Sequence, residues 1–123
     1  MTYSSRLLDH FHYPRHAGEL ADATVVVDTT NPVCGDVMKL WLKIKERRVT
    51  DATFKADGCA PAIACGSWLT EWLSVGRSLD EARLVTPETV AAGLGGVPTA
   101  SKHAAELAVD ALMKALDALN PYA

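Results

Sequence analysis

Two neighbouring segments that alternate between apolar and polar residues constrain the fold more than any other feature of this chain. In residues 37–45 one side carries Met38, Leu40, Leu42 and Ile44, and the other carries Lys39, Trp41, Lys43 and Lys45. Residues 49–57 alternate in the same way through Ala52, Phe54 and Ala56. Because successive side chains of a strand point to opposite faces, both segments predict half-buried strands. A turn at residues 46–48 joins them into an antiparallel hairpin.

Another strand and a short helix are predicted before this hairpin. Residues 24–30 are rich in β-branched side chains and end at an Asn-Pro pair, which favours a strand. In residues 4–13 the apolar side chains recur at helical spacing, and Pro14 blocks continuation of the helix. The first half of the chain is therefore expected to form a helix followed by a three-stranded meander.

The second half of the chain carries helix signals. Pro61 suits the first turn of a helix, because its missing N–H would be unpaired there. Ser78 opens a capping box and Thr86 precedes a proline, so two short helices are predicted, the second ended by a glycine-rich loop. A long apolar-faced helix follows from near Ser101 to the Asn-Pro pair at residues 120–121. Strands followed by helices indicate an α+β domain, a small three-stranded antiparallel sheet with helices packed on one face.

Length and composition limit the classes of function. The 123 residues fit one domain spanning residues 1–123, and 49% hydrophobic with 22% charged residues is ordinary for a globular protein. The apolar runs are too short to span a membrane and the N-terminus is unlike a secretory signal, so a cytoplasmic location is expected. The net charge is −3 and the basic residues are dispersed, so we expect neither nucleic acid nor a membrane as a partner.

Three cysteines cannot all pair within the chain, and in a reducing compartment such thiols are often metal ligands or nucleophiles. Cys34 and Asp36 fall in the turn between the first two strands, and Cys59 precedes the first long helix. Both connections can lie at one end of a meander, and His103, at the start of the last helix, can reach the same end. A helix N-terminus lowers the pKa of a nearby thiol and favours the thiolate. Two Cys, an Asp and a His can bind zinc or iron tetrahedrally.

Each of these residues also has a purely structural interpretation, since the chain has no CxxC motif. Cys34 and Cys59 are small residues beside turn glycines, Asp36 suits a turn-capping position, and His103 suits an exposed helix start. Cys65 lies on the apolar stripe of the first long helix, where packing in the core explains it at least as well as metal ligation.

Two other groups of residues are interpreted as structural. His10 and His12 are close in sequence, but helical residues two apart do not share a face, so a metal site there is not favoured. Together with His16 they are expected to form a solvated polar surface. Trp68 and Trp72 are four apart on one helix and are expected at the edge of the core or at an interface.

A series of short motifs runs through the chain in order. The opening has Tyr-Ser at residues 3–4, Asp-His at 9–10 and Pro-Arg at 14–15. Then follow CGDVMKL at residues 34–40, FK at 54–55, GC at 58–59, AIA at 62–64, LTEW at 69–72 and GRSLDEA at 76–82. Over nearly its whole length the chain therefore resembles the IscU/NifU-type iron-sulfur cluster assembly scaffolds.

The resemblance implies an α+β domain on which iron and sulfur from a cysteine desulfurase are combined into a [2Fe-2S] cluster, which later passes to acceptor proteins. The family's site has three cysteines, an aspartate and a histidine beside the last cysteine, and it can hold zinc when no cluster is present. Carried over by position, the site residues are Cys34, Asp36, Cys59 and His103. An oxygen ligand such as that of Asp36 binds iron less durably than a thiolate, which suits a site that releases its cargo.

The chain departs from the family at three places. Ala104 stands where the third cysteine, a ligand implicated in receiving sulfur, should follow the histidine. Residues 97–101 replace the Pro-Pro-Val-Lys stretch that an Hsp70-type chaperone recognises in some members, so chaperone-driven release is not assumed. Cys65 stands where typical members carry a small polar residue, which raises the hypothesis that it replaces the missing ligand or sulfur acceptor. The alternative is that Cys65 packs in the core.

We therefore expect a scaffold or carrier that binds iron or zinc and a transient [2Fe-2S] cluster, not an enzyme, with Cys65 as a fifth candidate in the cofactor site. A homodimer that bridges a cluster between subunits is one option, since a single subunit offers few thiolates. The alternative function is a zinc-binding interaction or regulatory protein of the same fold that assembles no cluster. A third interpretation is a thiol enzyme that uses Cys34 or Cys59 with His103 as base.

Overall fold

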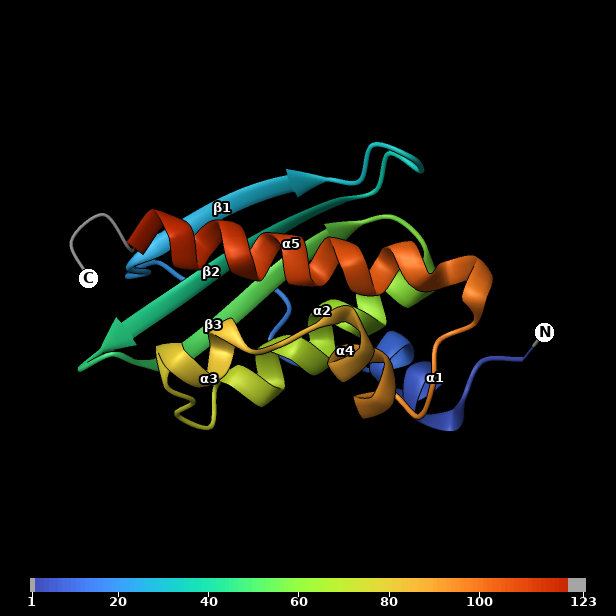
Figure 1. Ribbon diagram of the computed structural model, residues 1–123, viewed down its shortest axis with the longest axis horizontal. Helices are drawn as coiled ribbons and strands as arrows, with labels where there is room; N and C mark the ends of the chain where they lie inside the picture. Colours follow the sequence, from blue (N-terminus) through green and yellow to red (C-terminus); the bar gives the residue numbers. More distant parts are fainter. Residues whose placement is uncertain (1, 120–123) are drawn as a thin grey trace.

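The computed structural model describes residues 2–119, in which one three-stranded sheet is followed by helices (Figure 1). The strands are β1 (Val25–Thr30), β2 (Val37–Lys45) and β3 (Arg48–Asp57). They pair antiparallel in the order β1-β2-β3, as the alternating segments predict.

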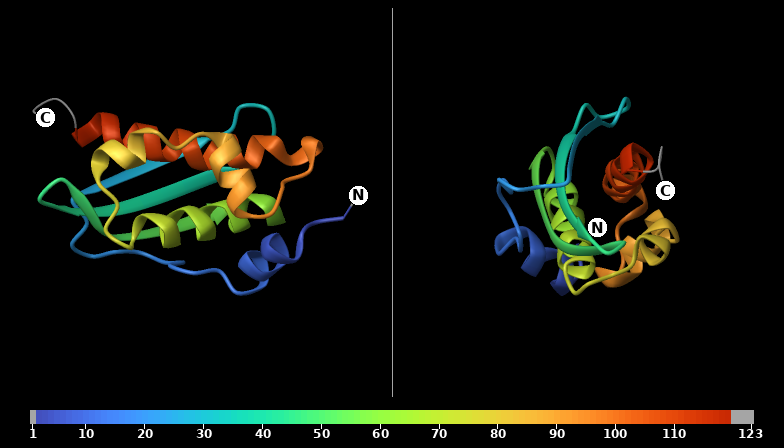
Figure 2. Two further views of the ribbon diagram at one scale, coloured as in Figure 1. Left: turned by 60° about the horizontal axis from the view of Figure 1, so that its bottom comes forward. Right: turned by 90° about the vertical axis from the view of Figure 1, so that its left-hand side faces the viewer.

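The helices lie mainly on one side of this sheet. They are α1 (Ser5–His12), α2 (Ala60–Leu73), α3 (Leu79–Arg83), α4 (Pro87–Gly93) and α5 (Lys102–Leu119). Helix α2 packs against β3, α5 packs against β1 and β2, and α1 packs against α2 (Figure 2). The α+β fold with helices on one face is confirmed. The Asn-Pro pair that is predicted to end the last helix lies outside the described residues.

The core lies between the sheet and helices α2 and α5. Met38, Leu40 and Leu42 of β2 are fully buried there. At Gly66 of α2 a β-carbon would lie 2.5 Å from the ring of Phe54, so glycine allows this helix to approach β3 closely. The stacked rings of the two tryptophans of α2 are partly buried against the same core, at its edge as predicted.

The outer face of the sheet is more covered than the alternation predicts. Trp41 lies on this face and is nevertheless only 6% exposed. The segment between α1 and β1 crosses the face here, because Lys43 Nζ bonds Asp22 at 2.6 Å and Lys55 Nζ bonds Glu19 at 3.1 Å. The prediction of a half-buried strand is therefore wrong at Trp41, whose ring also has Lys39 Nζ over it at 5.3 Å.

Helix α1 docks on α2 through a buried histidine. His10 is 7% exposed, and its Nδ1 lies 2.7 Å from Ser67 Oγ of α2. The same hydroxyl oxygen accepts the backbone N–H of Arg15 at 2.8 Å. The prediction of a solvated histidine is wrong for His10, because α2 covers that side of α1, whereas His12 and His16 are exposed.

Three chain segments meet at one end of the molecule, the right-hand end in Figure 1. They are the loop between β1 and β2, the junction between β3 and α2, and the start of α5. Within residues 2–119, no helix is both long and apolar enough to cross a bilayer.

Candidate functional site

Cys34 and Asp36 lie in the loop between β1 and β2, and Asn31 closes this loop. The carbonyl of Asn31 accepts the N–H of Gly35 at 2.9 Å, and the N–H of Asn31 donates to the carbonyl of Asp36 at 2.8 Å. Gly35 has a φ of 77°, in the left-handed region that glycine adopts without strain. The resulting turn leaves Cys34 exposed at the end of the molecule.

Asp36 connects this loop to the start of α2. Its Oδ2 accepts the backbone N–H of Cys59, the N-cap residue of α2, at 3.2 Å. Gly58 permits the approach, because a β-carbon at this residue would lie 2.4 Å from Asp36 Cγ. The Cys59 side chain makes no capping hydrogen bond.

His103 enters the site from the first turn of α5. Its Nε2 lies 3.9 Å from Cys59 Sγ. One ligand atom each from Cys34, Asp36 and His103 lies within 4.8 Å of the other two. The structure thus brings the four residues predicted from the sequence to one end of the fold. Two sulfur donors, one oxygen and one nitrogen are a donor set that suits zinc or iron.

The local charges act in opposite directions on the carboxyl and the thiol. Burial raises the pKa of Asp36, but the backbone N–H of Cys59, the thiols of Cys59 and Cys34 and the nearby His103 outweigh it, so the net shift is downward. The pKa of Cys59 is raised, first by burial and then by Asp36 and Cys34, while only the N–H of Ala62 lowers it. The expectation that the helix start favours a thiolate is therefore not met at Cys59, where burial, Asp36 and Cys34 outweigh the N–H of Ala62 in their effect on the pKa.

Cys65 is a buried residue of α2. It is fully buried in the hydrophobic core, and this burial, together with Cys59, raises its pKa to about 12. Ala104, at the position expected for the family's third cysteine, is also fully buried. If Cys65 takes no part, the three cysteines of the chain leave two thiols at the candidate site. The participation of Cys65 stays a prediction, and its burial favours the alternative of core packing.

Two residues that support the site are missed by the sequence reasoning. Asn31 reads only as the end of a strand, although Asn is a residue that commonly bonds the backbone of a following turn. Gly58 reads only as a turn glycine, whereas its role is to make room for Asp36. The Asn-Pro pair before the loop is the local signal for the turn that Asn31 forms. No local signal shows that Gly58 makes room for Asp36.

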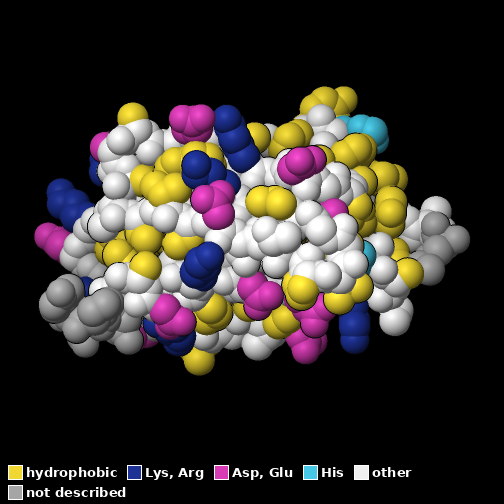
Figure 3. All heavy atoms as spheres, turned by 90° about the horizontal axis from the view of Figure 1, so that it is seen from above, with side chains coloured by type: hydrophobic (Ala, Val, Ile, Leu, Met, Phe, Trp, Pro, Cys, Tyr) yellow, Lys and Arg dark blue, Asp and Glu magenta, His cyan; other side chains and the backbone are white. Residues whose placement is uncertain are grey.

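The surface around the site exposes hydrophobic and histidine side chains. In the view of Figure 3, hydrophobic side chains gather at the right-hand end, where both visible histidine patches lie, and also on the left, and charged side chains lie in the centre, on the left and at the lower right. The loop itself exposes Val33, which is 89% accessible.

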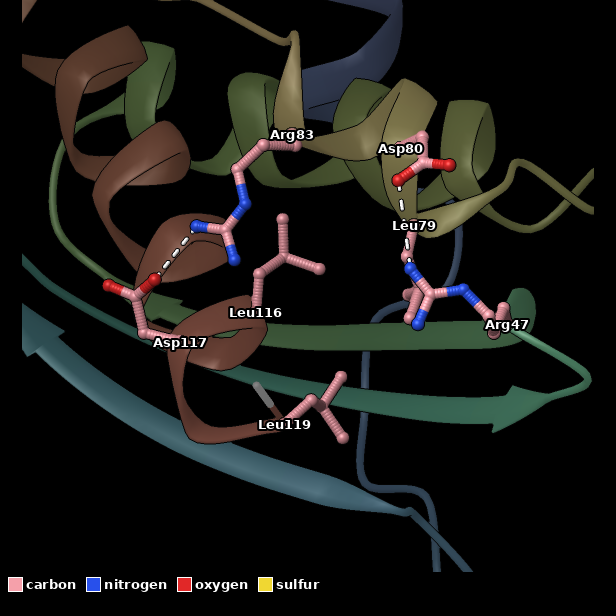
Figure 4. A pocket seen from close by; sticks show the side chains of 7 residues that line it. All are labelled: Arg47, Leu79, Asp80, Arg83, Leu116, Asp117 and Leu119. Atoms are coloured by element: carbon pink, nitrogen blue, oxygen red, sulfur yellow. Dashed lines mark hydrogen bonds and ion pairs between the residues drawn. The ribbon is translucent and has the colours of Figure 1, made fainter. Parts of the chain in front are cut away.

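A separate pocket lies at the opposite end, between the β2–β3 turn, α3 and the last turn of α5 (Figure 4). Its charged groups are already paired, Arg47 with Asp80 at 3.6 Å and Arg83 with Asp117 at 2.7 Å. Leucines complete its lining, and it contains no cysteine or histidine. This pocket therefore offers no donors to the metal site.

Comparison with protein families matches residues 2–121 to the NifU-like N terminal domain. An iron-sulfur cluster assembly scaffold protein IscU of Archaeoglobus fulgidus is 43% identical over 114 residues, which are 93% of this chain and 74% of that protein. The iron-sulfur cluster assembly scaffold protein IscU of Escherichia coli K12 is 38% identical over 120 residues, which are 94% of this chain and 92% of that protein.

The fold is also similar to a solved structure. The N-terminal part of a nitrogen-fixing NifU-like protein from Brucella abortus superposes with a TM-score of 0.80 at 20% identity. The match covers 97% of this chain and 94% of that one, which supports the α+β fold.

Proposed function

This chain belongs to the NifU-like N-terminal domain family of iron-sulfur cluster assembly scaffolds, and from this premise we propose that it carries a transient [2Fe-2S] cluster, or zinc in its absence. Membership confirms the resemblance seen in the motifs. It also agrees with the expected non-enzymatic role, because the similar proteins are scaffolds. The observation that carries the proposal is the close group of ligand atoms from Cys34, Asp36 and His103, with Cys59 Sγ 3.9 Å from His103 Nε2.

The number and kind of donors support this function. A [2Fe-2S] cluster takes four protein ligands, two on each iron, and structural zinc takes four in a tetrahedron. Cys34, Asp36, Cys59 and His103 provide four. The carboxylate and imidazole replace two of the usual thiolates and bind iron less durably, which suits cargo that must leave again.

Access to the thiols supports exchange with other proteins. Cys34 is exposed beside the exposed Val33, so a partner can reach its sulfur, while Cys59 is half-buried. We propose a cysteine desulfurase as the source of sulfur and acceptor proteins as recipients of the cluster. The expected cytoplasmic location, with neither nucleic acid nor membrane as partner, is part of this proposal, and an Hsp70-type chaperone is not included.

Anaerobic reconstitution tests the proposal. The metal-free protein is incubated with iron, cysteine and a desulfurase, and visible absorption and acid-labile sulfide are measured. The wild type and Asp57→Ala, an exposed neighbour of the site, should gain both signals. Cys34→Ser and Cys59→Ser should lose most of the sulfide. Wild-type protein that acquires no labile sulfide would refute cluster assembly.

The alternative is a zinc-binding interaction or regulatory protein of the same fold, and Ala104 in place of the third cysteine favours it. Stable zinc without labile sulfide in the same experiment would support this alternative. A thiol enzyme is a third case, which would require that alkylation abolish a turnover that metal removal leaves intact.

A further inference from the structure

Asn31 is a polar residue buried directly before the exposed loop of the site. It is only 7% exposed. Its side-chain Oδ1 accepts two backbone N–H groups, from Val33 at 2.9 Å and from Cys34 at 3.2 Å. An Asn side chain that bonds the backbone two and three residues further on is an Asx turn, which fixes the chain direction locally.

The tip of the loop, at Val33 and Cys34, is exposed to solvent. Val33 is 89% exposed and Cys34 is exposed, so burial of apolar side chains does not order these two residues. The backbone bonds of Asn31 reach Gly35 and Asp36, and leave the N–H groups of Val33 and Cys34 to the side chain. Oδ1 of Asn31 is therefore the side-chain acceptor that holds the N–H groups of Val33 and Cys34, within a loop that the backbone bonds of Asn31 close.

From this geometry we infer that Asn31 is a positioning residue, which holds Cys34 where its sulfur can share a metal with Asp36 and His103. The inference rests on the proposed metal-binding function and adds a residue to it that does not touch the metal. Outer residues of this kind orient the ligands, and their loss typically lowers metal affinity about 10–100-fold.

Zinc competition with a chromophoric chelator tests this role. We expect Asn31→Ala to weaken zinc binding by about tenfold or more. Asn31→Ser and Asn31→Asp keep an oxygen acceptor and should retain most of the affinity. Thr30→Ala, a change at the exposed preceding residue, is the matched control and should bind as the wild type does.

A double-mutant cycle separates a positioning role from a general loss of stability. In the Cys34→Ser background the further change Asn31→Ala should have little effect, because the ligand that Asn31 positions is already gone. With cobalt as the probe, Asn31→Ala should reduce the thiolate-to-metal charge-transfer absorption toward the level of Cys34→Ser.

The outcomes distinguish this inference from the proposed function. Wild-type protein that binds neither zinc nor cobalt refutes the metal site itself. If the wild type binds and Asn31→Ala binds within about threefold of it, or loses the same factor with and without Cys34, the positioning role is refuted. If Asn31→Ala does not fold, Asn31→Ser and Asn31→Asp test the positioning role, because both keep an acceptor oxygen. Loss of the cobalt–thiolate absorption in both folded variants would contradict that role.

Discussion

At the scale of single residues, the position of Asp36 depends on the missing side chain of Gly58. A β-carbon there would lie 2.4 Å from Asp36 Cγ and 2.6 Å from Oδ2, so the carboxylate must move in Gly58→Ala. Because the carboxylate is one of four proposed donors, we expect zinc affinity to fall by about tenfold or more. Chelator competition measures the change.

The control for this prediction is the next residue toward the strand. Asp57→Ala alters an exposed side chain and should leave zinc affinity unchanged. Asp36→Ala gives the limit in which the carboxylate is absent, and Gly58→Ala should approach it. Equal affinity of Gly58→Ala and wild type would mean that Asp36 is not a ligand or that it can move at no cost.

The two interpretations of Cys65 give opposite results in Cys65→Ala. Because the side chain is fully buried in the core, we expect unchanged zinc and cluster loading and a loss of stability of about 1–3 kcal/mol. Metal analysis, labile sulfide and denaturant unfolding measure the three quantities. A fall in loading without a fall in stability would instead support Cys65 as replacement for the family's third cysteine.

At the scale of elements, the contact between α1 and α2 depends on an uncharged histidine. The pKa of His10 is lowered, first by burial and then by the positive charge of Arg15, which together outweigh Glu71 and Asp9. The unfolded chain therefore binds this proton more readily than the folded protein. The stability due to neutral His10 is present above about pH 6.5 and is lost as the pH falls through the lowered pKa of the folded state.

Denaturant midpoints at about pH 7.5 and pH 5.5 check this linkage, since the two values lie on either side of the ordinary histidine pKa. The midpoint of the wild type should fall more than that of His10→Gln, which has no proton to bind at this position. His12→Gln, at an exposed residue, should behave as the wild type does. Identical pH dependence of the wild type and His10→Gln would contradict the assignment.

Regular elements could be predicted because their signals are local. Alternation predicts β2 and β3, and the capping residues Ser78 and Thr86 begin α3 and α4 with their side-chain bonds in place. What fails is the prediction of which surfaces another element covers. Trp41 is buried on the face that the segment before β1 crosses, and His10 lies against Ser67 of α2, 57 residues further along the chain.

At the scale of the whole molecule, one subunit supplies four donors to the proposed site. We therefore expect reconstituted protein to remain a monomer with one [2Fe-2S] cluster per chain. Native mass spectrometry reports both the mass and the cluster content. A dimer with a single cluster would instead support the bridged homodimer, the option that the small number of thiolates raises.

The convergence of the candidate site residues could be predicted from the sequence, but the residues that support them could not. Motif resemblance and strand order predict that four residues lie at one end of the fold: Cys34, Asp36, Cys59 and His103. Their environment depends on tertiary contacts, and so the raised pKa of Cys59 and the bonds made by Asn31 emerge only in the folded protein.

The distances along the chain between the donors make metal binding a form of cross-linking. Asp36 and Cys59 are 23 residues apart, and Cys59 and His103 are 44 apart. The unfolded chain holds no such site, so a metal that binds only the folded state adds about 2.7 kcal/mol of stability at a hundred times its dissociation constant. On the proposed function, release of the metal or cluster would remove the links between the β1–β2 loop, α2 and α5. When the metal or cluster is removed, amide hydrogen exchange should increase at this end of the molecule before it increases elsewhere. Delivery of the cargo would then be coupled to local unfolding.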